Sequence, residues 1–147
     1  MKETRPLTSQ NDSKATLFLI EDDQADVFLV KRALAKHGGN IALVNARDGA
    51  EALEMLRGGE IERPFVILSD LNMPGMSGYE FLDEIRADAA LRDSIIFVIS
   101  SSNLAEDVNL AYQHFASGYI VKEMEPAKMA RSMQLLFDFC EIIRLPS

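Results

Sequence analysis

Acidic side chains directly follow two short apolar segments of the chain. Glu21, Asp22 and Asp23 come after "ATLFLI", and Asp70 comes after "FVILS". If these segments are neighbouring strands, three or more carboxylates meet in a partly dry site. Carboxylates so placed raise one another's pKa and destabilise the protein unless a cation lies among them. The pattern therefore implies a bound cation.

The candidate ligands are hard oxygen atoms, with no histidine or thiolate among them. Such a set suits Mg²⁺ or Mn²⁺ and disfavours zinc. Two further segments end in groups suited to an anion: Lys122 follows "GYIV", and the hydroxyl of Ser100 ends "IIFVIS". A carboxylate nucleophile, a divalent metal, a lysine and a hydroxyl together favour phosphoryl transfer onto Asp70.

Each of these residues also has a simpler interpretation. Asp23 fits equally well as the N-cap of a following helix. Glu21 and Asp22 fit solvated loop acids, and Asp70 fits a residue that begins the turn "NMPG". Lys122 on its own is uninformative because most lysines are solvated. The functional interpretation depends on all of these residues lying close together in the folded protein.

Five short segments rich in β-branched and apolar residues predict strands: "ATLFLI", "NIALVN", "FVILS", "IIFVIS" and "GYIVK". Helical patterns separate and follow them. Capping boxes are predicted at Asp48 to Glu51, Ser77 to Glu80 and Asn103 to Glu106. "HGG" and "RGG" are typical of helix ends, and Pro126 begins a last helix that extends to about Ile143.

Strands that alternate with helices, with apolar middle strands, predict an α/β fold: a doubly wound, five-stranded parallel sheet with helices on both faces. Function in such sheets lies in the loops at the carboxyl ends of the strands. The acidic loop "EDDQAD" argues against a flavin phosphate there.

Length and composition describe a single domain. The chain has 147 residues, of which 48% are apolar, enough for one core but not two. Residues 1–14 are polar and predict a flexible leader, residues 15–140 form the domain, and residues 141–147 extend beyond it. Without a long apolar run or a signal peptide, we expect a cytoplasmic protein that makes no membrane contact.

Charge and the rarer residues exclude several classes of site. The net charge of −8 and the scattered basic residues argue against nucleic-acid binding. The single cysteine, Cys140, cannot form an internal disulfide and is expected to act as a small apolar residue. We expect His37 and His114 to be structural.

The order of the acidic pair, "SDLNMPGMSG", "VISSS" and "GYIVK" resembles the receiver domain of two-component response regulators, of the chemotaxis type, from about Thr16 to Phe139. The spacing agrees too, with thirty positions from Asp70 to Ser100 and twenty-two from Ser100 to Lys122. The resemblance implies that Asp70 accepts a phosphoryl group from a phosphohistidine on a sensor histidine kinase.

The resemblance also implies the flavodoxin-like (βα)5 fold, with strand order 2-1-3-4-5, and roles for the surrounding residues. Glu21, Asp22 and Asp70 would bind Mg²⁺, with the backbone carbonyl of Asn72 completing its coordination. Lys122 would pair with the phosphoryl oxygens. Ser100 and Tyr119 occupy the two switch positions. Activation would shift the packing of the fourth helix, fifth strand and fifth helix.

Two positions depart from the family pattern. Glu123 follows Lys122 where many receivers have a proline joined through a cis peptide bond. The first acid is Glu21 rather than an aspartate, and with this longer side chain we expect a water between the carboxylate and the metal.

The last helical segment carries two apolar stripes where a helix on a sheet needs one. Met129, Met133, Leu136, Cys140 and Ile143 form the first stripe; Leu135, Phe139 and Ile142 form the second. The second stripe indicates either a wider core face or contact with another copy of the chain. We expect a homodimer through the fourth helix, the fifth strand, the fifth helix and the C-terminal extension.

Several functions remain open. A stand-alone receiver with an "EDDQADVFLVKRAL"-type start and an extended C-terminus resembles regulators paired with bacterial phytochrome kinases. It would catalyse only its own phosphorylation and dephosphorylation. A phosphate sink or a relay to a histidine phosphotransfer protein, and an interaction module without phosphorylation, are alternatives. An aspartyl-phosphate phosphatase needs an acid where Asn72 stands.

Overall fold

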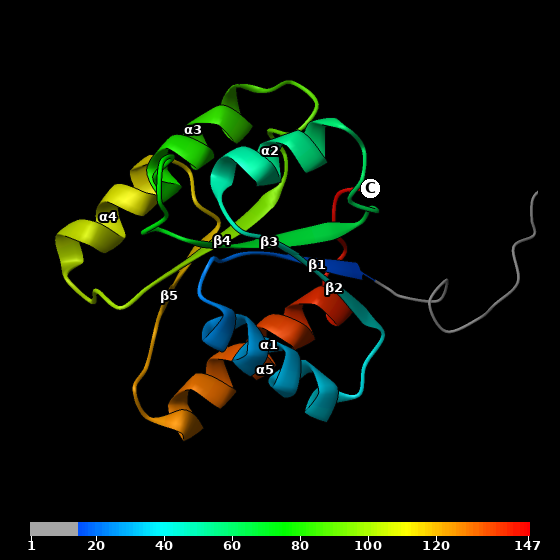
Figure 1. Cartoon of the computed structure of the whole chain (residues 1–147), viewed down its shortest axis with the longest axis vertical. Coiled ribbons are helices and arrows are strands. Elements are labelled where there is room, and N and C mark those ends of the chain that lie inside the picture. Colours follow the sequence, from blue (N-terminus) through cyan, green and yellow to red (C-terminus); the bar gives the residue numbers. More distant parts are fainter. Residues whose placement is uncertain (1–14) are drawn as a thin grey trace, which may run out of the picture.

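The computed structural model describes residues 15–147, in which five strands alternate with five helices (Figure 1). All pairings are parallel, and the strand order is β2-β1-β3-β4-β5, which confirms the predicted fold. The leader predicted for residues 1–14 lies outside the described part. The strands are β1 (Ala15–Ile20), β2 (Ile41–Ala46), β3 (Phe65–Asp70), β4 (Ile95–Ser100) and β5 (Gly118–Val121).

Helices cover both faces of the sheet: α1 and α5 lie on one face, and α2, α3 and α4 on the other (Figure 1). Their bounds are α1 (Gln24–His37), α2 (Gly49–Arg57), α3 (Gly78–Ala87), α4 (Ala105–Gln113) and α5 (Pro126–Ile142). Among residues 15–147, no helix is both long enough and apolar enough to cross a membrane.

The central strands have a packed core on each side, which explains their uninterrupted apolar sequences. Side chains alternate between the two faces, so Phe18 of β1 packs in the core under α2, α3 and α4. Its neighbour Leu17 packs in the core under α1 and α5. All six residues of β1 and of β3 are buried. The sheet is thus held rigidly between its two helical layers.

Most of the predicted helix ends are confirmed. The Asp48 side chain accepts a hydrogen bond from the Glu51 backbone N–H, and Ser77 and Glu80 form a full capping box. Gly38 ends α1 in the left-handed conformation. The box predicted at Asn103 is wrong, because α4 begins one residue later and no side chain caps it.

The two stripes of α5 are only partly as predicted. The first stripe is buried at Met133, Leu136 and Cys140, but Ile143 is 47% exposed. In the second stripe, Leu135 and Ile142 are 72% and 75% exposed, so both side chains are accessible to another protein surface. Phe139 instead packs edge-on against Phe97 of β4, with ring centroids 5.1 Å apart. Phe137, which belongs to neither stripe, is fully buried.

The end of the chain packs back onto its own domain. Leu145 is partly buried against the core under α1 and α5. Helix α5 continues to Ile142, so the domain boundary that we predicted at residue 140 falls inside the helix.

Candidate functional site

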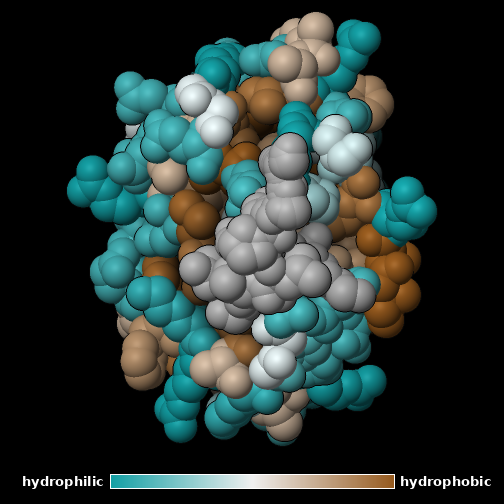
Figure 2. Space-filling view, turned by 90° about the vertical axis from the view of Figure 1, so that its right-hand side faces the viewer, coloured by the Kyte–Doolittle hydropathy of each residue, from teal (hydrophilic) through white to brown (hydrophobic). Residues whose placement is uncertain are grey.

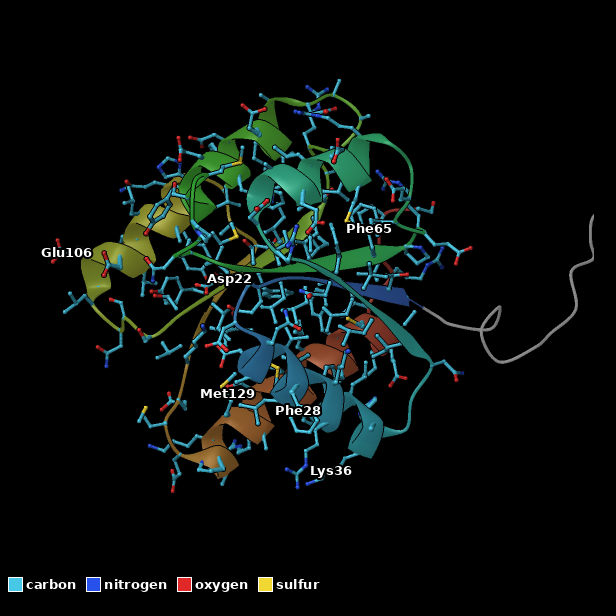
Figure 3. All side chains as sticks on the ribbon, in the orientation of Figure 1. Asp22, Phe28, Lys36, Phe65, Glu106 and Met129 are labelled. Carbon is cyan, nitrogen blue, oxygen red and sulfur yellow. The ribbon has the colours of Figure 1, made fainter. Side chains whose placement is uncertain are left out.

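The predicted site residues meet at one edge of the sheet. Asp70 and Ser100 are the last residues of β3 and β4, whereas Glu21 and Lys122 directly follow β1 and β5. Parallel strands bring these ends together. Figure 3 labels Asp22 at this edge, at the opposite end of the sheet from Phe65, where β3 begins.

Lys122 lies among three carboxylates. Its ammonium Nζ is 3.4 Å from Glu21 Oε1, 3.4 Å from Asp70 Oδ2 and 3.2 Å from Asp26 Oδ2. Burial alone would lower the pKa of Lys122, but the charges of Asp70 and Glu21, together with the hydrogen bond that Lys122 donates to Asp26, raise it above its ordinary value. Lys122 therefore stays protonated at neutral pH and supplies a fixed positive charge.

The two acids on the strand ends are deeply buried. Glu21 is 3% exposed and Asp70 is 6% exposed. Burial raises the pKa of Glu21 to about 7, the charge of Asp70 adds to this, and a hydrogen bond from Asp23 N–H and the charge of Lys122 oppose it. Without a further cation, the site thus holds more negative charge than it can easily keep ionised.

The two oxygens of Asp70 have different surroundings. Oδ1 accepts a hydrogen bond of 3.0 Å from the backbone N–H of Asn72, which fixes the orientation of the carboxylate. Oδ2 faces Lys122. One oxygen is therefore held by the following loop while the other points toward the cationic side of the site.

Three carboxylates are placed to share a metal ion. Glu21, Asp22 and Asp70 each offer an oxygen, and these oxygens lie within 4.8 Å of one another. Asp22 is exposed, so an ion has access from solvent. The set consists of hard oxygen donors, the chemistry that Mg²⁺ and Mn²⁺ prefer. The residues present thus fit such an ion.

Ser100 and Tyr119 both contact Ser102 in the β4–α4 loop. The Ser100 hydroxyl accepts a 3.2 Å hydrogen bond from Ser102 N–H, and the Tyr119 hydroxyl donates a 2.8 Å hydrogen bond to the Ser102 carbonyl. Ser102 also donates from its own hydroxyl to Asp107 on α4. The two predicted switch residues are therefore linked through one loop residue to the start of α4.

The loop after β5 is anchored without proline. Lys122 N–H donates a 2.7 Å hydrogen bond to the Ser100 carbonyl. The cis peptide bond found in residues 15–147 is Arg63–Pro64, so the Lys122–Glu123 bond is trans.

Sequence reasoning missed two residues of this site. Asp26, in the first turn of α1, makes the shortest contact with Lys122. Its position three residues after the helix cap Asp23 could have indicated that it faces the same edge of the sheet. Gly78 begins α3 beside Asp70: a Cβ there would lie 2.6 Å from Leu71 Cα and 3.0 Å from the Asp70 carbonyl oxygen. The turn after Asp70 therefore has no room for a side chain at this position.

Comparison with known proteins agrees with this geometry. The sequence model of the response regulator receiver domain matches residues 17–134. The chain belongs to this family. It is therefore a receiver domain of two-component signalling.

Curated relatives include regulators of different length. The probable methanogenesis regulatory protein FilR2 of Methanothrix harundinacea is 29% identical over 84% of this chain and 81% of its own length. The nitrate/nitrite response regulator protein NarL of Escherichia coli K12 is 36% identical over 84% of this chain. The match spans only 55% of NarL.

Similar solved structures include a phytochrome response regulator and a Mn²⁺-bound response regulator. The phosphorylated cyanobacterial phytochrome response regulator RcpA is 33% identical, with a TM-score of 0.81, over 90% of this chain and 98% of its own. Response regulator Rcp1 in its Mn²⁺-bound form is 29% identical, with a TM-score of 0.81, over 90% and 99% of the two chains. Receiver domains of this type thus include a divalent-metal binder.

Proposed function

We propose that this receiver is a phosphorylation switch in which Asp70 accepts a phosphoryl group from a phosphohistidine of a sensor kinase. The observation that carries the proposal is the placement of Asp70: a buried carboxylate with one oxygen 3.4 Å from Lys122, and with oxygens of two further acids within 4.8 Å of its own. In the transfer, an oxygen of Asp70 forms the new bond to phosphorus while the bond from phosphorus to the imidazole nitrogen of the donor breaks.

Each neighbouring residue has a defined part in this proposal. Lys122 pairs with a phosphoryl oxygen, because its charge is fixed and it already lies beside Asp70. The Asn72 N–H holds the carboxylate in orientation through its bond to Oδ1. The Ser100 hydroxyl turns from Ser102 N–H to the phosphoryl group, and this frees the loop to which Tyr119 is bonded.

Glu21, Asp22, Asp70 and the backbone carbonyl of Asn72 would hold a divalent ion, Mg²⁺ or Mn²⁺. Such an ion supplies positive charge to the phosphoryl oxygens. The raised pKa of Glu21 supports this assignment, because the charge of a bound cation would offset the burial and the nearby Asp70 charge that keep its carboxylate from ionising.

We further propose that the partner kinase is a bacterial phytochrome and that the receiver acts as a homodimer. The first proposal rests on the likeness to the phytochrome response regulator RcpA. The second rests on the exposed apolar side chains of α5, Leu135 and Ile142. The dimer surface would include α4, β5, α5 and the residues after Ile142.

Intact-mass spectrometry after incubation with a small phosphodonor tests the central proposal. We expect one phosphoryl group on the protein in the presence of Mg²⁺, none after chelation of the metal, and none on Asp70→Asn. A beryllium fluoride complex should form under the same metal requirement. An adduct that persists in Asp70→Asn would refute the assignment, as would a wild-type protein that gains neither the phosphoryl group nor beryllium fluoride.

A further inference from the structure

A second group of side chains with metal-ligand chemistry joins α1 to α5. His37 is the last residue of α1, and Asp138 and Glu141 lie one turn apart on α5. Each of the three offers a ligand atom, and these atoms lie within 4.8 Å of one another. His37 is separated from Asp26, at the phosphoacceptor end of α1, by roughly 16 Å along the helix at 1.5 Å per residue. This group is therefore separate from the carboxylates around Asp70.

The carboxylate of Glu141 is held in place by the turn between α1 and β2. Its Oε2 accepts a 3.1 Å hydrogen bond from Asn40 N–H, and its Oε1 lies 2.7 Å from His37 Nε2. Gly39 makes room for it, because a Cβ there would lie only 2.0 Å from Glu141 Oε2. The turn thus orients one oxygen of Glu141 toward the imidazole before any ion arrives.

Gln134 contacts two of the three candidate ligands. Its carboxamide nitrogen is 3.0 Å from His37 Nδ1 and donates a 2.9 Å hydrogen bond to Asp138 Oδ1. Residues 134, 138 and 141 share one face of α5. In this arrangement Nδ1 accepts and Nε2 carries the proton that faces Glu141. A metal on Nε2 therefore requires Gln134 to turn its carboxamide, so that its oxygen accepts from Nδ1–H and orients the ring. The ring is also shielded, since the side chain of His37 is only 9% exposed.

We propose that His37, Asp138 and Glu141 form a second metal site, for a borderline transition ion such as Zn²⁺, that bridges the C-terminal ends of α1 and α5. The imidazole nitrogen distinguishes this set from the all-oxygen set at Asp70, because one nitrogen and two carboxylates suit Zn²⁺ rather than Mg²⁺. The ion would take the place of the proton that His37 and Glu141 share at 2.7 Å.

A bound ion would fix the end of α5 that carries Ile142. This residue is 75% exposed and directly follows Glu141. The ion would therefore stiffen the helix end next to the proposed dimer surface without touching Asp70. The metal site itself does not depend on the proposed phosphorylation function.

Calorimetric titration with Zn²⁺ tests the site. We expect one Zn²⁺ per chain in wild type and in the double variant Asp22→Asn, Asp70→Asn, in which the phosphoacceptor carboxylates are removed. Asp138→Asn, which keeps the His37–Glu141 contact, should weaken Zn²⁺ binding at least tenfold, and His37→Gln should do the same. Glu54→Gln, at an exposed acid of α2, is the matched control and should bind as wild type does.

These variants distinguish Zn²⁺ binding at His37, Asp138 and Glu141 from Zn²⁺ binding at Asp70. Loss of Zn²⁺ binding in the double variant alone would place the ion at Asp70 and overturn the proposal. Equal binding by wild type, Asp138→Asn and His37→Gln would overturn it too, as would no binding to wild type. Circular dichroism of each variant establishes that the fold is retained.

Discussion

Asp26 Oδ2 lies 3.2 Å from Lys122 Nζ, closer than either strand-end acid. Lys122 is the cation proposed to meet the phosphoryl group, so Asp26 competes for it from α1. The side chain of Asp26 is 37% exposed, so solvent weakens this contact but does not abolish it. The first turn of α1 therefore bears on the reactivity of Asp70.

Asp26→Asn should speed phosphorylation by a small donor. Removing the competing carboxylate leaves Lys122 free to pair with Asp70 and the incoming phosphoryl group. A partly exposed ion pair is worth about 0.5–1 kcal/mol, which corresponds to a rate increase of about two- to fivefold at saturating Mg²⁺. The rate of appearance of the phosphorylated mass measures it.

Asp23→Asn is the control for Asp26→Asn, because it removes the same charge three residues away. Asp23 caps α1 through Ala25 N–H, and asparagine caps equally well. Its phosphorylation rate should match wild type. Equal acceleration by both variants would mean that the loss of a negative charge near the site, and not the loss of the contact with Lys122, speeds phosphorylation.

Gly78→Ala should destabilise the domain and slow phosphorylation. The new methyl group would meet the backbone of Leu71 and Asp70, which cannot move without shifting the site. Overpacking of this kind lowers the free energy of unfolding by about 1–3 kcal/mol. Denaturant unfolding measures the loss.

Gly49→Ala is the matched substitution, since Gly49 also begins a helix. Its Cβ would meet the sulfur of Met76 at 3.0 Å, and a methionine side chain adapts easily. Its free energy of unfolding should stay closer to that of wild type. If Gly78→Ala were as stable as Gly49→Ala, the tight turn after Asp70 would have no structural importance.

Asp88 should make stability depend on acid pH. Its carboxylate accepts hydrogen bonds from Ala90 N–H at 2.9 Å and from Arg57 at 3.1 Å, and these partners lower its pKa. A lowered pKa means that the unfolded chain binds the proton more tightly. The stabilisation is therefore present above the unfolded value, about 3.9, and is lost as pH falls through the folded value.

The melting temperatures of wild type and Asp88→Asn test this dependence. Wild type should melt higher at pH 6, and the difference should shrink as pH is lowered toward 3. Glu62→Gln, at an exposed acid before β3, should show no such convergence. A constant difference between wild type and Asp88→Asn across this range would contradict the assignment.

The sheet and its strand-end residues could be predicted because apolar segments mark where strands end and parallel strands place those ends together. Contacts made by helices were harder to predict. Glu141 reaches His37 across 104 residues, and no local pattern encodes that pairing. Phe139 shares helical spacing with Leu135 and Ile142, yet its size lets it reach Phe97 on the sheet. The spacing of residues along a helix predicts which face a side chain lies on, but not which distant residue that side chain contacts.

The exposed residues of α5 should control assembly without supporting the fold. Leu135 and Ile142 are 72% and 75% exposed. Figure 2 shows that hydrophobic side chains reach the surface among hydrophilic ones on one side of the domain. We expect wild type to sediment as a dimer and the variant Leu135→Lys, Ile142→Lys as a monomer. Its melting temperature at low protein concentration should be unchanged, because neither side chain contributes to the core.

Two substitutions separate assembly from folding in this experiment. Phe28→Lys on α1, at a side chain 60% exposed, makes a similar change on another helix and should leave the dimer intact. Phe137→Ala, at a residue 1% exposed on α5, should lower the free energy of unfolding by about 3–5 kcal/mol. If wild type sediments as a monomer, or if Phe28→Lys dissociates the dimer as fully as the α5 variant does, α5 is not the dimer surface.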